Sequence, residues 1–241
     1  FPRFSRKNRR KMIFLAVFQP VLYFAFETYG LKLSPAAKAS LIIATVPVAV
    51  TILSAFLLKE RTGGAGLLGI VISLAGIGVL VGGDPRFTPA LGGPLAGDLL
   101  VFGAVISAAF YMVLARDVGR DHSSVEITGI QTIYGAFFFA PAFLFELPSM
   151  EWAAVTGRSL IAVLYLTIFA TIFAFLCWNH ALTRLPAARA AVSINGIPLV
   201  TALGAWAMLG ETLTLLQMSG GVLVLAGVFL TNLPGIYRSG G

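Results

Sequence analysis

Charged side chains are scarce in this sequence. Only 11% of the 241 residues are Asp, Glu, Lys or Arg, whereas 58% are hydrophobic and the mean hydropathy is +0.90. Soluble proteins carry about 25% charged residues, which they need in order to cover their surface. The composition therefore excludes a soluble globular domain and predicts an integral membrane protein whose surroundings are the lipid bilayer.

Cysteine and histidine are almost absent, with one cysteine, Cys177, and two histidines, His122 and His180. One cysteine forms no internal disulfide, and two distant histidines make a weak case for a metal. The sequence also lacks His-Glu-x-x-His, Gly-x-Ser-x-Gly and the phosphate-binding Gly-x-x-x-x-Gly-Lys-Ser/Thr motif. We therefore expect no enzyme, no cofactor, no metal and no ATP-driven pump.

The positive charge is concentrated at the beginning of the chain. The net charge is +7, and six of the 17 bases fall within the first 11 residues: Arg3, Arg6, Lys7, Arg9, Arg10 and Lys11. These bases border an apolar run, which indicates a cytoplasmic flank of a membrane span rather than a nucleic-acid-binding surface. We expect both ends of the chain to lie in the cytoplasm, at the cell membrane.

Apolar segments of about 20 residues are long enough to cross the hydrocarbon core as helices. The sequence contains eight, at 12–31, 36–58, 64–82, 98–115, 125–145, 159–182, 187–209 and 213–233. The breaks between them are short and carry Pro, Gly or charge, which leaves no room for a soluble domain. The predicted fold class is all-α, with eight transmembrane helices.

The sequence resembles itself at a constant offset, here called the repeat spacing, which places position 186 on position 35. The pairs include Pro35 and Pro186, Pro47 and Pro198, Glu60 and Glu211, Gly69 and Gly220, and Gly76 and Gly227. Five spans separate equivalent positions, and this odd number gives the two copies opposite directions through the membrane. Inverted repeats with the substrate between them are common in secondary transporters.

The repeating unit has five helices, but the spans at 98–115 and 125–145 have no counterpart in the first copy. We expect residues 1–82 to be the last three helices of the first repeat and residues 98–233 to be a complete second repeat. On this interpretation, the first two helices of an inverted 5+5 helix arrangement are absent from the chain.

Two segments carry a family resemblance: SPAAKASLIIATVPVAVTILSAFLLKE and LPAARAAVSINGIPLVTALGAWAMLGE, each followed by a glycine-rich span. They resemble the EamA-type transporters of the drug/metabolite transporter superfamily. The resemblance implies a secondary transporter that exports small metabolites or drugs by alternating access, and it does not identify the substrate. A receptor or assembly subunit without transport stays open as the alternative function, followed by an intramembrane enzyme. The sequence is also compatible with a homodimer.

Ionisable side chains within spans are costly and are therefore candidates for function. Glu27 and His180 are the two in this sequence, and His180 lies near the inner end of its span. Gln19, Tyr23 and Glu27 are spaced by four residues and share one helix face. This face lines a substrate pathway, or else Glu27 reaches water at the membrane interface. On the first interpretation Glu27 binds a cationic group or a proton, and its repeat partner Trp178 contributes an aromatic surface.

Other polar and proline residues lie deeper in the spans. Pro47 and Pro198 each remove a backbone donor and are expected to kink their helices at matching depths. The remaining candidates for the substrate pathway are Gln131, Tyr134, Asn195 and Trp206. Asn195 and Gln131 could equally join helices by hydrogen bonds.

Two acids and a run of charges have structural explanations. Glu60 and Glu211 stand just before helices, next to Thr62 and Thr212, and are expected to stabilise those helix N-termini. Asp117 and Asp121, with Arg116 and Arg120, are expected to form a solvated loop.

Overall fold

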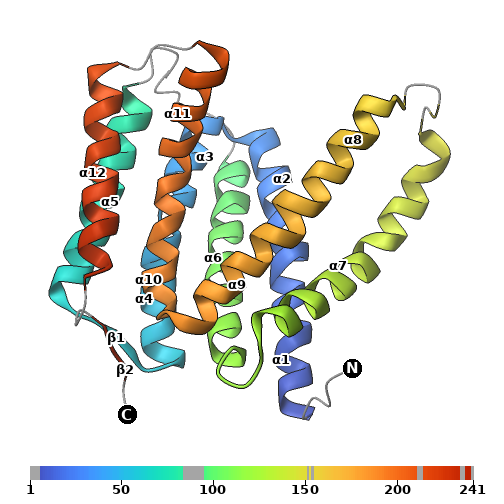
Figure 1. Cartoon of the computed structure of the whole chain (residues 1–241), viewed down its shortest axis with the longest axis horizontal. Coiled ribbons are helices and arrows are strands. Elements are labelled where there is room, and N and C mark those ends of the chain that lie inside the picture. The colour runs from blue at the N-terminus through green and yellow to red at the C-terminus, as the bar shows by residue number, and fades with distance from the viewer. Residues whose placement is uncertain are drawn as a thin grey trace.

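The structure is a computed structural model that describes residues 6–83, 95–150, 152, 155–210, 214–233 and 237–239. It is almost entirely helical (Figure 1). Within the described residues, eight helical segments are long and apolar enough to cross a membrane: Asn8–Leu33, Lys38–Leu57, Gly64–Gly82, Leu95–Val118, Ser124–Ser149, Gly157–Arg184, Ala187–Met208 and Leu215–Asn232. The predicted all-α membrane class and the number of spans are confirmed.

Most spans consist of more than one helical piece. The first part of the chain forms α1 (Arg6–Ala16), a π-helical segment (Val17–Leu22), α2 (Tyr23–Leu33), α3 (Ala36–Ile43), α4 (Val46–Leu57), strand β1 (Glu60–Thr62) and α5 (Gly64–Gly82). The second part forms α6 (Leu95–Val118), α7 (Ser124–Glu146), a 3-10 turn (Leu147–Ser149), α8 (Gly157–Tyr165), a π-helical segment (Leu166–Phe173) and α9 (Ala174–Arg184). It continues with α10 (Ala187–Val192), a 3-10 turn (Ser193–Gly196), α11 (Ile197–Leu209), α12 (Leu215–Thr231) and strand β2 (Tyr237–Ser239), which pairs antiparallel with β1.

The helix boundaries recur along the chain. The first residues of α3, α4 and α5 precede those of α10, α11 and α12 by the repeat spacing, and the first residues of α1 and α2 precede those of α8 and α9 in the same way. Lys59 and Gly210, which are also equivalent in the repeat, both have left-handed backbone angles, with φ of 56° and 67°. The proline-containing spans are interrupted at matching places, because Pro47 and Pro198 are each the second residue of the helix that follows the break.

The most extensive helix contact joins α5 and α12, which lie side by side in Figure 1. A Cβ atom added to Gly76 would lie 2.6 Å from the backbone nitrogen of Val224, and one added to Gly227 would lie 2.5 Å from that of Ser73. The contacts are reciprocal and antiparallel: Gly69 meets Gly227, and Gly76 meets Gly220. Glycines permit this approach, which adds dispersion attraction where lipid offers no hydrophobic driving force.

α6 lies at the centre of the bundle and contacts α1, α2, α3, α4 and α9. It extends to Val118, beyond the predicted end of the span at position 115. The prediction of a solvated loop at Arg116 and Asp117 is therefore wrong, because both residues belong to the last turn of α6. Arg116 forms an ion pair with Glu60, and Asp117 forms one with Lys11.

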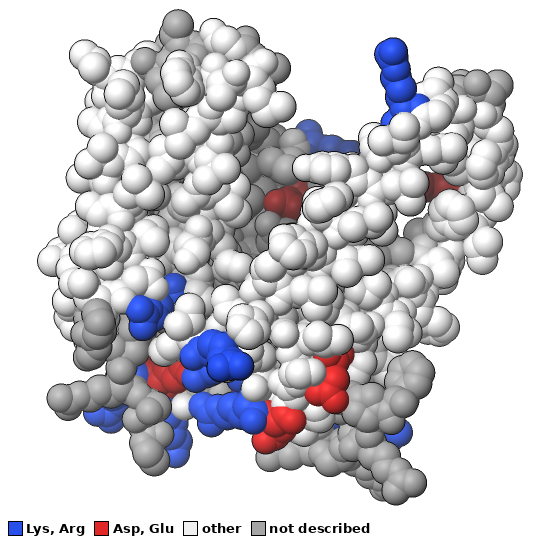
Figure 2. Space-filling model, in the orientation of Figure 1, with Lys and Arg blue, Asp and Glu red and all other residues white. Residues whose placement is uncertain are grey.

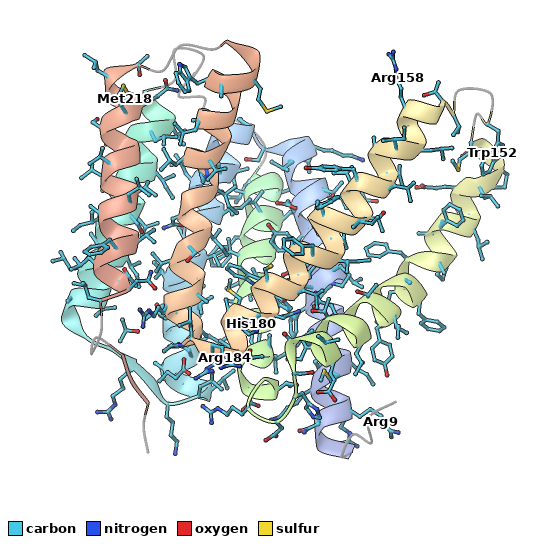
Figure 3. All side chains as sticks on the ribbon, in the orientation of Figure 1. Arg9, Trp152, Arg158, His180, Arg184 and Met218 are labelled. Atoms are coloured by element: carbon cyan, nitrogen blue, oxygen red, sulfur yellow. The ribbon has the colours of Figure 1, made fainter. Side chains whose placement is uncertain are left out.

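Both the beginning of α1 and the pair β1–β2 lie at one end of the molecule, here called the terminal end (Figure 1). Charged side chains gather over this end in Figure 2. Figure 3 shows His180 and Arg184 of α9 in the half towards the terminal end, where Arg9 also lies, whereas Trp152 and Arg158 lie at the opposite end. The ends of α7 and α8 thus project away from the charged surface.

Equivalent positions of the two copies differ in burial. Met12 and Leu15 of α1 have exposed fractions of 1% and 0%, because α6 and α7 cover them. Their equivalents in the second copy, Val163 and Leu166, are 60% and 55% exposed. No described side chain of α8 is buried. The second copy therefore presents an uncovered apolar face where the first copy is packed.

Candidate functional site

A cavity of about 450 Å³ lies between the helices of the two copies. Figure 2 shows the molecule hollowed between the part with α11 and the part with α8, in the half away from the terminal end. The described residues that line the cavity are Gln19, Tyr23, Glu27, Ser40, Ile43, Ala44, Val46, Ile77, Ala108, Met112, Ala170, Ala174, Phe175, Trp178, Ile194, Asn195, Ile197 and Pro198. Most of them are apolar, so the few polar groups determine which ligand chemistry can bind.

Gln19, Tyr23 and Glu27 form the polar wall of the cavity. Gln19 has extended backbone angles (φ −145°, ψ 121°) and precedes Pro20, whose missing N–H donor interrupts the helix at this point. Tyr23 donates a hydrogen bond from its hydroxyl to Oε1 of Glu27 at 2.9 Å, one helical turn further along α2. The bond fixes the orientation of the half-buried carboxylate.

The same positions of the second copy also line the cavity. Ala170, Ala174 and Trp178 are the repeat equivalents of Gln19, Tyr23 and Glu27, and all six line the cavity. The second copy thus replaces polar side chains by two small alanines and one indole ring. The negative charge of the lining thus comes from the first copy and the indole ring of Trp178 from the second.

Asn195 contributes a buried polar group to the same cavity. It lies in the 3-10 turn between α10 and α11 and is among the described residues that line the cavity. Its Nδ2 donates to Oγ of Ser73 on α5 at 2.8 Å, so it also joins two helices. Its Oδ1 is buried and accepts no hydrogen bond from any described residue. The amide therefore combines both roles that the sequence left open, a helix contact and a place at the cavity.

Several predicted pathway residues do not reach the cavity. Tyr134, Trp206 and Pro47 are not among the described residues that line it, and the side chain of Trp206 is 56% exposed. His180 is exposed as well.

Gln131 is likewise outside the cavity and belongs to a buried network that joins α6, α7 and α9. Tyr111 donates to Oδ1 of Asn179 at 2.9 Å, and Nδ2 of Asn179 donates to Thr128 at 2.9 Å and to Oε1 of Gln131 at 3.3 Å. Asn179 is fully buried, and our sequence reasoning missed it. The signal was available, because an Asn in an apolar span requires hydrogen-bond partners on neighbouring helices.

Glu60 does not cap the helix that follows it, so that prediction is wrong. The N-cap of α5 is Gly63, without a side-chain hydrogen bond. Glu60 instead accepts a hydrogen bond from the backbone N–H of Ala187, the first residue of α10, at 3.0 Å, while its other oxygen pairs with Nε of Arg116 at 3.0 Å. Glu211 and Thr212 lie outside the described residues, and α12 is capped by Thr214 with a capping box to Gln217.

Comparison with known proteins agrees with this architecture. The sequence profile described as "EamA-like transporter family" matches residues 1–82 and 95–233. A solved crystal structure with 22% sequence identity superposes with a TM-score of 0.75, over 95% of this chain and 77% of the other. At that identity the superposition supports the fold alone.

Relatives named as transporters cover most of the chain. The "Uncharacterized transporter YetK" of Bacillus subtilis is 26% identical over 96% of this chain and 70% of its own length. An "Uncharacterized transporter" of Archaeoglobus fulgidus is 28% identical, over 95% of this chain and 79% of its own. The "Probable terminal-alkyne amino-acid exporter" of Streptantibioticus cattleyicolor is 30% identical, over 82% and 64%.

Proposed function

The chain belongs to the EamA-like transporter family, and on this premise we propose that it is a secondary transporter that exports small metabolites or drugs through the described cavity. The relatives support transport as the general activity. The amino-acid exporter among them supports the outward direction and a small organic substrate. The energy then comes from an ion gradient or from the gradient of the substrate itself.

One observation carries this proposal: matching residues of the two copies meet at one cavity. Positions 19, 23 and 27 line it together with positions 170, 174 and 178, and positions 43, 44 and 46 line it together with 194, 195 and 197. A cavity at the contact of two equivalent halves is where a relative movement of the halves would change access. The helix breaks before Pro47 and Pro198 lie beside it and supply irregular backbone at membrane depth.

The inverted orientation of the repeats is part of the proposal. It is supported by the recurring helix boundaries and by the reciprocal, antiparallel glycine contacts between α5 and α12. The exposed apolar face of α8 supports it too, because the equivalent face of α1 is covered by α6 and α7. We expect two further helices, equivalent to α6 and α7, to cover α8 in the ten-helix arrangement.

Alternating access requires that the cavity be closed on one side while it is open on the other. The buried side chains of Val50, Leu182 and Ala191, together with the Glu60–Arg116 ion pair, fill the interior on the side of the terminal end. The opposite half is hollowed in Figure 2. With the basic terminal end in the cytoplasm of a cell membrane, this conformation is open outward and closed inward.

Cysteine accessibility tests the proposal. Cys177 is the single cysteine, so Cys177→Ser provides a background in which one new thiol can be labelled. Ala174→Cys lies at the cavity, and Ala75→Cys lies on the exposed outer face of α5 as a matched control. The complete protein is placed in sealed vesicles of either orientation, and a membrane-impermeant thiol reagent is added from outside.

The cysteine thiolate attacks the reagent, and it forms only where water reaches the residue. We expect Ala174→Cys to be labelled from both sides of the membrane and Ala75→Cys from neither. The ratio of labelling rates from the two sides should change when a transported substrate is added. Labelling of Ala174→Cys from one side only, under every condition and for every substrate, would rule out alternating access at this cavity.

A further inference from the structure

We propose that the cavity selects protonated primary and secondary amines that carry an apolar or aromatic body. In this assignment Glu27 binds the positively charged ammonium group, and Oδ1 of Asn195 accepts a hydrogen bond from an N–H of the same group. The inference rests on the proposed function, because it names the substrate class of the same cavity.

The charge of the cavity favours a cation. Glu27 is the one charged side chain among the described lining residues, and none of those residues is Lys or Arg. The carboxylate is half-buried, and the Tyr23 hydroxyl holds one of its oxygens in place. A carboxylate in a largely apolar cavity is costly without a partner, and an ammonium group supplies both opposite charge and hydrogen-bond donors.

The buried amide adds a second requirement. Asn195 lines the cavity, and its Oδ1 is buried and receives no hydrogen bond from the described part of the chain, while its Nδ2 is bonded to Ser73. An acceptor that is left unpaired in a buried position is unfavourable, so a ligand that donates to it is favoured. A primary or secondary ammonium carries the two N–H groups needed for Glu27 and Asn195, whereas a quaternary ammonium carries none.

The rest of the wall defines the body of the ligand. Trp178 offers an indole face for a cation or an aromatic ring, and Phe175, Met112 and Ile77 are apolar. A zwitterionic amino acid would bring a carboxylate beside Glu27 with no described lining base to pair with it. The cavity therefore favours an amphipathic monocation over an amino acid of the same shape.

Three probes of similar shape separate these features. They are 2-phenylethylammonium, its N,N,N-trimethyl derivative, which has no N–H group, and phenylalanine, which adds a carboxylate. Equilibrium binding of each is measured with the complete purified protein in lipid nanodiscs at neutral pH. We expect 2-phenylethylammonium to bind about tenfold or more tightly than the other two probes.

Variants assign the preference to residues. Glu27→Gln keeps the shape and should weaken binding of 2-phenylethylammonium roughly 10- to 100-fold, because a charge-assisted hydrogen bond is lost. Asn195→Leu removes the acceptor and should reduce the preference for 2-phenylethylammonium over the trimethyl derivative by roughly fivefold. Glu146→Gln changes an exposed Glu at the end of α7 and serves as the matched control. The preference is a ratio within one variant, so it does not depend on how much protein folds.

The outcomes separate this inference from the proposed function. Equal binding of the three probes, no binding of 2-phenylethylammonium, or unchanged binding by Glu27→Gln overturns the amine class, even if cysteine labelling shows alternating access. Conversely, Glu27-dependent amine binding with labelling of Ala174→Cys from one side only supports the binding site and refutes transport through it.

Discussion

The ion pair between Glu60 and Arg116 should stabilise the closed terminal end. Its side chains are only 6% and 17% exposed, and Nε of Arg116 lies 3.0 Å from Oε1 of Glu60. Arg116 also donates to the carbonyl of Thr183 at 2.9 Å, and Glu60 accepts the N–H of Ala187. Glu60 of the first copy and Arg116 of the second copy thus hold the end of α9 and the start of α10 together.

The two single substitutions should differ in cost. Glu60→Gln keeps an acceptor for Ala187 but loses the charge, which lowers the free energy of unfolding by about 2 kcal/mol, as for a charge-assisted hydrogen bond. Arg116→Met leaves the buried carboxylate without a counter-ion, which costs about 3–5 kcal/mol. The double variant should cost about 1–3 kcal/mol less than the sum, because residues in contact are coupled.

Unfolding in mixed micelles with increasing denaturing detergent, followed by circular dichroism, measures these free energies. Glu146→Gln is the control for a change of Glu to Gln on an exposed surface and should stay within about 0.5 kcal/mol of the parent. Additive losses in the double variant would refute the reasoning, since two groups that interact directly cannot be thermodynamically independent.

Three further predictions concern the fold. Gly76→Ala should destabilise the protein by about 1–3 kcal/mol in the same unfolding assay, because its Cβ would lie 2.6 Å from a backbone nitrogen of α12. A Cβ at Gly78 would have no atom within 4 Å, so the control Gly78→Ala should leave the stability unchanged. Equal effects of the two substitutions would contradict the helix contact. Asn179→Leu should lower the free energy of unfolding by about 2–4 kcal/mol, because Tyr111, Thr128 and Gln131 lose a buried hydrogen-bond partner. Unchanged stability would exclude the network. In an experimental structure of the complete protein, residues 12–82 should superpose on 163–233 after a two-fold rotation about an axis in the membrane plane, with Pro47 over Pro198. A best superposition that keeps both copies in the same direction would refute the inverted repeat.

The sequence was sufficient for the membrane class, the eight spans and the family, because lipid imposes length and apolarity on every span. It was also sufficient to group Gln19, Tyr23 and Glu27, since one helix face follows from spacing by four. The register of the repeat identified Trp178 as the counterpart of Glu27, and both line the cavity. The roles of these residues in transport stay predictions.

The contacts between helices could not be read from periodicity. Glu60 bonds to a helix that begins 127 residues later, and nothing in its local sequence distinguishes that partner from the adjacent helix. Asn179 and Gln131 share a network because α7 and α9 pack together, which spacing along one helix does not determine. Trp206 shares a span with Asn195, but Asn195 lies in the 3-10 turn Ser193–Gly196 and Trp206 lies on α11, so their spacing in the sequence does not place them on one helix face.

We propose that the substrate passes through the described cavity, and blocking that cavity tests this directly. Ala174→Trp places a large side chain in the cavity, and Ala75→Trp places the same side chain on the exposed face of α5. Efflux of a metabolite panel, including 2-phenylethylammonium, is measured from vesicles that contain the complete protein or either variant at equal amounts. We expect the parent and Ala75→Trp to export at least one member of the panel at similar rates, and Ala174→Trp to export none of them. Export by Ala174→Trp at the parent rate would contradict the proposal.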